Sequence, residues 1–374
     1  MSKIIPLIKK EAVLFIAAVF ALASMFVVPP GAQYFSYIDY SVLVILFCLM
    51  LVVAGLKKLG ILDFLSLGLL TRAKNVKYLS ILLVNCVFIF SMFVTNDVAL
   101  IIFVPLTIEI FDFAGHKKLI FVIVMETLAA NLGSMLTPIG NPQNLFIYSF
   151  YRLSIVNFFE YVLPVGAVSY IIIMGIILVS RNDNRGIRFT QKFNMGKFML
   201  GNKKKLLLYY AGLFMLCIVT VLRILDYRIC ILVVITATLI VDRKLLKDVD
   251  YGLLLTFVCF FIFVGNLEEI DVIRNALSRF LEGRVFAVSV LSSQVISNVP
   301  AAMLISGYTN DARNLLLGVN IGGVGTPVAS LASLISFRLY SRSGNSAPGK
   351  FMATFTVYNI SILLVLFTIF YFFS

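Results

Sequence analysis

The chain has 374 residues, of which 61% are hydrophobic and only 13% are charged, well below the charged share of a soluble domain. This composition excludes a soluble protein, and long apolar runs without alternation exclude a membrane barrel. The net charge of +13 does not indicate nucleic-acid binding, because the basic residues lie in short loops between apolar runs, where they orient a protein in the bilayer.

Apolar runs follow one another along the whole chain and predict an all-α integral membrane protein with about nine full crossings. The predicted crossings are residues 12–28, 40–56, 119–150, 162–180, 206–222, 229–241, 251–267, 314–337 and 352–372. Gly and Pro interrupt two of these helices midway, 119–150 and 314–337. Helix breakers at membrane depth are tolerated only where protein or a water-filled cavity satisfies the freed backbone groups. Two broken transmembrane helices are therefore candidates for functional elements.

Two further segments, 78–111 and 285–308, carry polar residues at their centres. In the second, arms 285–296 and 299–308 give helices of about 18 and 15 Å, too short for a hydrocarbon core of about 30 Å. We therefore expect two re-entrant helical hairpins, each with an Asn at its tip.

The distribution of Lys and Arg predicts the orientation. Placing the N-terminus in the cytoplasm also places there 24 of the 31 basic residues, as the positive-inside rule requires. With nine crossings, the C-terminus is then outside. We expect a multi-pass protein of the cell membrane.

The two halves of the chain repeat each other. Asp39-Tyr40 aligns with Asp250-Tyr251, an offset of 211 residues, which falls to 202 at the hairpin tips and to 189 at the Thr-Pro pairs of the broken helices. The predicted organisation is a first repeat (1–180), a basic cytoplasmic linker (181–205), a connecting span (206–228) and a second repeat (229–374). The single connecting span turns the second repeat upside down, the layout of secondary transporters.

The hairpin tips and the broken helices supply the candidate site. A helix N-terminus at a tip offers unpaired N–H groups to an anion, and carbonyl and side-chain oxygens at a break suit a hard cation such as Na⁺. The predicted substrate-binding residues are Thr95, Asn96, Asp97, Thr137, Pro138, Asn141, Ser297, Asn298, Thr326 and Pro327. The predicted cation-binding residues are Asn96, Asn131, Gly133, Asn298, Asn320 and Gly322.

Two acids in membrane segments, Asp97 and Glu126, have no acidic partner in the other repeat. No Lys or Arg lies inside the core segments to neutralise them, so each is expected to pair with a cation, to be protonated or to face water. Asp97 is the first candidate for ion coupling. Glu126 is either a second one or a neutral acid bonded to its neighbours.

These motifs resemble the ion transporter superfamily, which includes divalent anion:sodium symporters, citrate transporters and the membrane subunit of arsenite pumps. The resemblance rests on Asn96-Asp97, on Gly133 to Asn144, on Asp250-Tyr251 leading to Glu268, and on Asn320 to Pro327. It implies that the hairpin tips hold substrate and cations, with Gly133 and Gly322 in the cation sites, and that the protein is a homodimer working as an elevator. The symporters carry Ser-Asn-Thr at both tips, whereas this chain has Asp97 and Val299 at the third positions.

The sequence thus predicts a secondary active transporter of a small anion, an inorganic oxyanion or a carboxylate, that works by alternating access. Na⁺ or H⁺ is the coupling ion, and no other cofactor is expected. Sequence motifs of ATP-binding, zinc-protease and prenyltransferase sites are absent, so an enzyme is not expected. Two alternatives stay open, a Na⁺/H⁺ antiporter and the membrane subunit of an ATPase-driven arsenite-type efflux pump.

Overall fold

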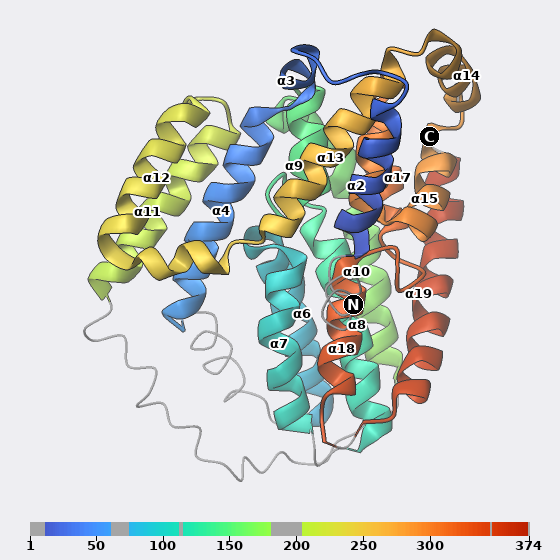
Figure 1. Ribbon diagram of the computed structural model, residues 1–374. Helices are drawn as coiled ribbons and strands as arrows, with labels where there is room; N and C mark the ends of the chain where they lie inside the picture. The colour runs from blue at the N-terminus through green and yellow to red at the C-terminus, as the bar shows by residue number, and fades with distance from the viewer. Residues whose placement is uncertain (1–11, 61–74, 112–114, 181–203, 345, 373–374) are drawn as a thin grey trace, which may run out of the picture.

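The computed structural model describes residues 12–60, 75–111, 115–180, 204–344 and 346–372 (Figure 1). In these ranges the regular elements are α-helices and one 3-10 helix, which confirms the all-helical prediction. Most of the predicted linker, residues 181–203, lies outside the described residues.

The first half of the chain forms eight described helices. They are α2 (Ala12–Met25), α3 (Gln33–Tyr37), α4 (Tyr40–Lys58), α6 (Val76–Val94), α7 (Asn96–Phe111), α8 (His116–Ser134), α9 (Pro142–Phe150) and α10 (Ile155–Val179). The predicted hairpin 78–111 corresponds to α6 and α7, and the predicted broken span 119–150 to α8 and α9. The break falls at residues 135–141, where the sequence places Thr-Pro and Gly.

The second half follows α11 (Lys204–Val221) with a similar order of elements. Its elements are α12 (Tyr227–Asp242), the 3-10 helix η4 (Arg243–Asp248), α13 (Tyr251–Glu268), α14 (Asp271–Leu281), α15 (Val285–Ile296), α16 (Asn298–Ser306), α17 (Ala312–Gly322), α18 (Leu331–Ser341) and α19 (Pro348–Tyr371). Among these, α14 has no counterpart among the described helices of the first half. The predicted hairpin 285–308 corresponds to α15 and α16, and the broken span 314–337 to α17 and α18.

Side-chain caps start equivalent helices in both halves. The carboxylates of Asp39 and Asp250 accept hydrogen bonds from the third residue of α4 and of α13, at 3.1 and 2.9 Å. After each break, Asn141 caps α9 and Ser330 caps α18. A side-chain oxygen at this position satisfies an N–H group that the helix cannot bond itself. The aligned Asp-Tyr pairs therefore mark equivalent helix starts.

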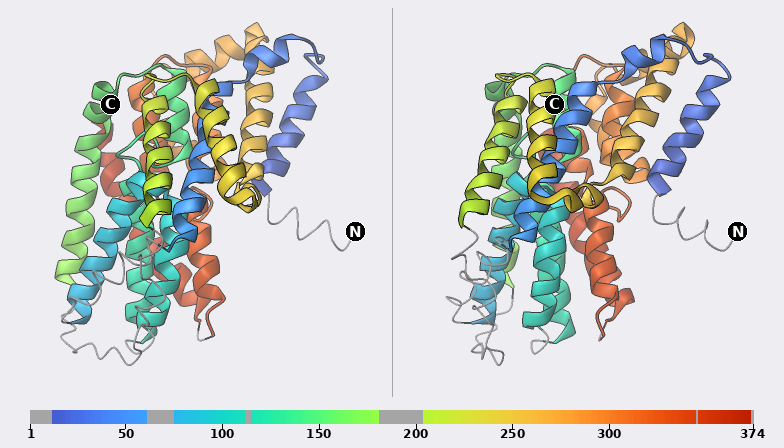
Figure 2. Two further views of the ribbon diagram at one scale, coloured as in Figure 1. Left: turned by 90° about the vertical axis from the view of Figure 1, so that its left-hand side faces the viewer. Right: turned by 60° about the vertical axis from the view of Figure 1, so that its left-hand side comes forward.

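Helix packing follows the same correspondence. The first arm of each hairpin packs on the first part of the nearest broken helix, α6 on α8 and α15 on α17. The second arms pack across the halves, α7 on α18 and α16 on α9, and α12 likewise packs on α4 while α2 packs on α13. The two halves therefore interlock, and both broken helices meet in the centre of the molecule (Figures 1 and 2).

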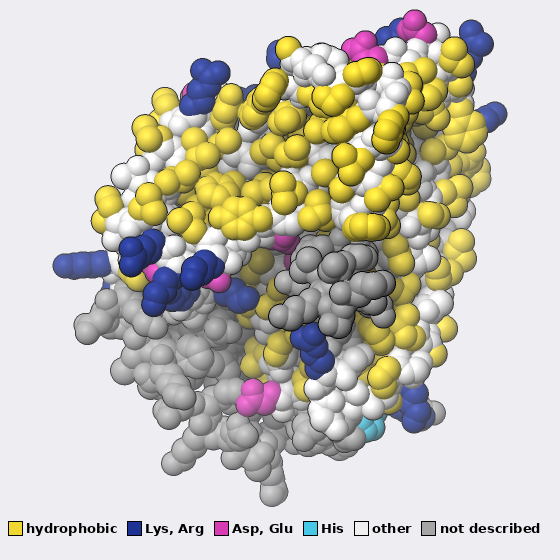
Figure 3. Space-filling view, in the orientation of Figure 1, with side chains coloured by type: hydrophobic (Ala, Val, Ile, Leu, Met, Phe, Trp, Pro, Cys, Tyr) yellow, Lys and Arg dark blue, Asp and Glu magenta, His cyan; other side chains and the backbone are white. Residues whose placement is uncertain are grey.

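Six described helices are long and apolar enough to cross a membrane: α4, α6, α10, α11, α13 and α19. Five coincide with predicted crossings, and α6 is the first arm of the first hairpin. Figure 3 shows an apolar band over the face drawn, with charged side chains gathered above and below it. Such a band matches the hydrocarbon core of a bilayer, and the protein is a multi-pass membrane protein.

Candidate functional site

The two hairpin tips have the same backbone conformation. Thr95 has φ 73° and ψ 152°, and Ser297 has φ 75° and ψ 156°, a region that residues other than Gly seldom adopt. The next N–H group donates in each case to a carbonyl of the facing break, Asn96 to Gly140 at 3.3 Å and Asn298 to Ala329 at 3.0 Å. Each tip is therefore attached to a broken helix of its own half.

The Thr-Pro pairs hold the first arms of the hairpins. The hydroxyl of Thr137 donates to the carbonyl of Met92, and the hydroxyl of Thr326 donates to the carbonyl of Gln294 at 2.9 Å. These carbonyls lie in the last turn of their arms, where the helix has no N–H group left to bond them. Both threonine hydroxyls thus donate their hydrogens to the hairpin arms, and not to a substrate. Pro138 is buried beside the first, and Pro327 is half-buried beside the second.

Gly133 and Gly322 allow close approach between helices. A Cβ atom on Gly133 would lie 2.3 Å from the carbonyl oxygen of Phe88 in α6, and one on Gly322 would lie 2.7 Å from Cβ of Ser293 in α15. Phe88 and Ser293 belong to the first arms of the two hairpins. Packing therefore requires glycine at both positions, independently of any contact with a cation.

Amide side chains join the two breaks reciprocally. The Asn131 amide oxygen accepts from Asn96 at 3.2 Å and from Ser330 at 2.8 Å, and its nitrogen donates to Ser333 at 3.4 Å. Asn96 lies at the first tip, whereas the two serines begin α18 in the other half. Asn131 is therefore bonded to both halves of the molecule.

Asn320 makes the equivalent contacts in the opposite direction. Its amide oxygen accepts from Asn141 at 3.1 Å, and its nitrogen donates to Asn144 at 2.6 Å and to the Leu316 carbonyl at 2.8 Å. Asn141 and Asn144 begin α9, as the two serine partners of Asn131 begin α18. All five asparagines of this cluster, Asn96, Asn131, Asn141, Asn144 and Asn320, are buried. The predicted site residues of the two breaks are thus brought together, bonded to one another.

The N–H groups at the tips are only partly free for an anion. The N–H of Asn96 is bonded to Gly140, and that of Asp97 lies 2.9 Å from the side-chain oxygen of Asn96. In the second hairpin, Asn298 is bonded to Ala329, and Pro300 has no N–H. Backbone donors alone therefore leave few contacts for a substrate anion at either tip.

A cavity of about 630 Å³ leads to the first tip and not to the second. Thr95, Asp97 and Asn141 line its inner part, together with apolar residues of α4 and α7, and none of its lining residues belongs to the second tip. Ser297 and Asn298 are buried. In the described part of the chain the Asp97 carboxylate has no hydrogen-bond donor or ion-pair partner. A carboxylate that lines a cavity without a protein partner can bind a cation or a proton.

Comparison with known proteins identifies the family of this chain. The family model described as "Citrate transporter" matches residues 3–312. The chain belongs to the citrate transporter family. It is 33% identical over 336 residues to an uncharacterised transporter of Methanocaldococcus jannaschii, covering 89% of this chain and 90% of the relative. It is 30% identical over 308 residues to the inner membrane protein YbiR of Escherichia coli, covering 81% and 80%.

A shorter match links this citrate transporter family member to a plant protein. The silicon efflux transporter LSI3 of rice is 30% identical over 130 residues, which is 35% of this chain and 27% of the relative. The family description and the name of this plant relative thus refer to different solutes. Membership in this family establishes that the protein is a membrane transporter and not an enzyme. It does not identify the transported solute.

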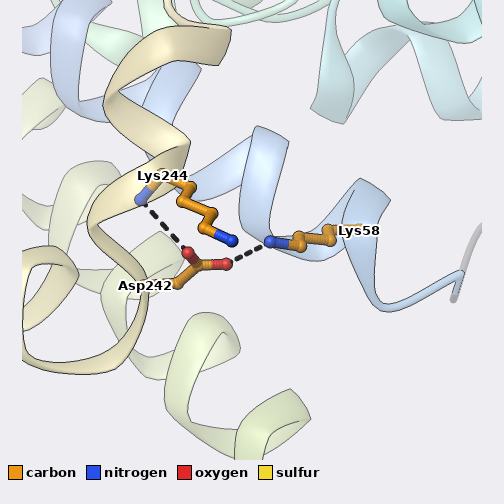
Figure 4. A network of polar contacts seen from close by, with 3 residues as sticks. All are labelled: Lys58, Asp242 and Lys244. Atoms are coloured by element: carbon orange, nitrogen blue, oxygen red, sulfur yellow. Dashed lines mark hydrogen bonds and ion pairs between the residues drawn. The ribbon is translucent and has the colours of Figure 1, made fainter.

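Charged side chains surround the mouth of the cavity. Lys57 and Lys58 come from the end of α4, Asp248 is the last residue of η4, and Asp250 caps α13. Figure 4 shows Lys58 in an ion pair with Asp242, whose other oxygen accepts the backbone N–H of Lys244. The hydrogen bond from Lys58 holds the pKa of Asp242 below its usual value. The ion pair joins the end of α4 to the end of α12.

Glu126, the second predicted coupling residue, lies away from the cavity. It is fully buried in α8, and its Oε1 accepts a hydrogen bond of 2.5 Å from the hydroxyl of Thr107 in α7. Its Oε2 has no partner among the described residues. The structure therefore separates the two acids: Asp97 lines the cavity, whereas Glu126 lies between α7 and α8.

Sequence reasoning missed Gln294, the most heavily bonded side chain at the second break. Its amide nitrogen donates to the carbonyls of Gly322 at 2.6 Å and Val324 at 3.1 Å, and its amide oxygen accepts from the N–H of Thr326 at 2.9 Å. The offset of 202 residues aligns it with Met92, which has no amide. A polar residue opposite an apolar one in aligned repeats was the available signal.

Proposed function

We propose that this transporter moves a small anion, an inorganic oxyanion or a carboxylate, by alternating access coupled to Na⁺ or H⁺. The observation that carries the proposal is the cavity that ends at Asp97, whose carboxylate has no partner in the described residues. A volume of about 630 Å³ suits a small solute with its hydration water. At the mouth two lysines are matched by Asp248 and Asp250, and Asp97 favours a cation bound together with the anion.

The proposed architecture is an inverted repeat with two re-entrant hairpins, two broken helices and nine crossings. Its support is the recurrence of individual contacts at the offsets of the sequence repeat. The tip conformation recurs between Thr95 and Ser297, and the hydroxyl bond of Thr137 to α6 recurs between Thr326 and α15. Contacts repeated at this level arise naturally from duplication of one unit.

We further propose that the molecule is in an inward-facing state. The cavity mouth is formed by the ends of α4 and η4, which the charge distribution assigns to the cytoplasm. Five helices also extend beyond the level of η4 toward the side that the charge distribution assigns to the cytoplasm: α6, α7, α8, α18 and α19 (Figures 1 and 2). The cavity residues Thr95 and Asp97 correspond to Ser297 and Val299, which are buried. Alternating access would expose the second set on the other side.

Uptake into proteoliposomes tests the proposal. A panel of oxyanions and carboxylates is offered under an imposed Na⁺ or H⁺ gradient, with wild type, Asp97→Asn and the control Asp248→Asn, which changes an acid at the cavity mouth. We expect gradient-driven flux of at least one anion, lost or uncoupled in Asp97→Asn and kept in Asp248→Asn. If neither gradient drives any solute through the wild type, the proposal fails.

A Na⁺/H⁺ antiporter is the second candidate, and one observation favours it. The inner part of the cavity contains Asp97 and no basic side chain, since both lysines of its lining lie at the mouth. A single carboxylate can bind Na⁺ and H⁺ in turn. Proton release driven by a Na⁺ gradient, without any added anion, would select this candidate.

A further inference from the structure

The break between α17 and α18 exposes backbone carbonyls that a side chain of the same half satisfies. The Gln294 amide nitrogen donates to the carbonyls of Gly322 and Val324, at 2.6 and 3.1 Å, and also lies 3.2 Å from the Val290 carbonyl of its own helix. Carbonyl oxygens gathered at a helix break are also the ligands that a hard cation takes. The two N–H groups of the amide thus direct partial positive charge at the place where such a cation would lie.

The surrounding backbone fits this amide closely. The Gln294 oxygen accepts the N–H of Thr326 at 2.9 Å, so both ends of the amide are bonded. A Cβ atom on Gly325 would lie 2.2 Å from that oxygen, and Gly325 has φ 123°, which only glycine adopts readily. Gln294 is therefore an integral part of the second break.

At the first break a different side-chain amide bonds the exposed backbone carbonyls. The amide nitrogen of Asn144 donates to the carbonyls of Met135 and Thr137, both at 3.0 Å. Its counterpart in the other half is Ser333, which has no amide, and the counterpart of Gln294 is Met92. Each half thus contributes one amide, from a different position, to the carbonyls of its own break.

We infer that these two amides take the place of coupling cations at the breaks, so that the transporter binds a single coupling ion, at Asp97. This inference rests on the proposed function only in assuming that transport is ion-coupled. The predicted backbone cation sites at Gly133 and Gly322 then act as packing and hydrogen-bonding elements. Asp97, which lines the cavity and has no counterpart in the second half, carries the coupling alone.

Replacing Gln294 by the residue of the other half, Gln294→Met, tests the inference. The change removes the amide and frees the carbonyls of Gly322 and Val324. We expect the apparent Tm of the purified protein in choline chloride to fall, and to return toward the wild-type value in NaCl, because Na⁺ now binds the freed carbonyls. The control Asn359→Leu removes a buried amide bonded only to its own helix, through the Phe355 carbonyl, and should lower Tm without a Na⁺ response beyond that of the wild type.

Gln294→Glu covers the case in which the methionine variant does not fold. It keeps the length of the side chain and replaces the donor by a carboxylate, which should make Tm dependent on Na⁺ more strongly still. If neither variant responds to Na⁺ more strongly than the wild type does, the inference is overturned.

Ion stoichiometry gives the second readout. The dependence of wild-type flux on the coupling ion should have a Hill coefficient near one, and that of Gln294→Met a higher one when Na⁺ is present. A wild-type coefficient near two would overturn the inference while leaving the proposed transport intact. Failure of every gradient to drive flux would instead refute the proposed function, and the Tm measurements would still decide the role of Gln294.

Discussion

Asn320 is the strongest single link between the two breaks, and Asn320→Ala should be costly. Its buried amide makes two bonds to α9, with Asn141 and Asn144, and one to its own helix. Each bond is worth about 0.5–1.5 kcal/mol net, and an acceptor left buried without a donor costs about 1–3 kcal/mol. The Asn144 oxygen would be such an acceptor, whereas Asn141 keeps a bond to Ser134. We expect a loss of about 2–4 kcal/mol in the free energy of unfolding.

Reversible unfolding in mixed micelles of mild detergent and SDS measures this loss. Asn359→Ala is the control, since Asn359 is equally buried but bonds only to its own helix. It should lose about 1 kcal/mol. A double-mutant cycle between Asn320→Ala and Asn144→Ala should give a coupling energy of about 1 kcal/mol or more for their 2.6 Å bond. A cost no larger than that of the control, with no coupling, would refute the role of the amide cluster.

Three further variants probe other parts of the molecule. Glu126→Gln keeps an oxygen for the threonine hydroxyl of α7, so we expect ion dependence of transport close to wild type, and a lost dependence would move coupling to this residue. Gly307→Ala places a Cβ atom 2.0 Å from the Glu268 carboxylate and 2.9 Å from Val264, so it should reduce stability, and the double variant with Glu268→Ala should recover part of the loss in thermal unfolding. The lowered pKa of Asp242 means that its bond to Lys58 stabilises the fold above the ordinary aspartate pKa and is lost as pH falls through the lowered value. Unfolding of wild type and Asp242→Asn should therefore differ at neutral pH and converge in acid, and a constant difference would contradict this assignment.

Much of the architecture was predictable because it depends on local chemistry. Hydropathy gave the membrane helices, and polar residues within apolar runs gave the tips at Thr95 and Ser297. The Thr-Pro pairs gave the positions of both breaks. Local signals of this kind depend on helix length, on missing N–H groups and on the cost of polar groups in lipid. The residues that give such a signal lie within a few positions of the helix end, tip or break that they predict.

The roles of individual site residues were less predictable. Thr137 and Thr326 were expected to contact substrate, yet their hydroxyls bond the hairpin arms, and Gly133 and Gly322 accommodate neighbouring helices. Polar residues at a break can face a ligand or one another, and composition does not distinguish these cases. Gln294 lies within a helical arm, where no helix breaker marks its position in the sequence.

By itself, the sequence determined the class of protein, the order of its helices and the places where they break. It also determined that the halves are unequal, since Asp97 and Gln294 each lack a counterpart. Only the tertiary structure decided which groups are free, because Ser330, a partner of Asn131, and Asn144, a partner of Asn320, lie in the opposite half of the chain. Packing of distant helices satisfies those amides and leaves the Asp97 carboxylate facing a cavity. Which polar groups are bonded and which are free depends on neighbours in space, and the local sequence does not specify these neighbours.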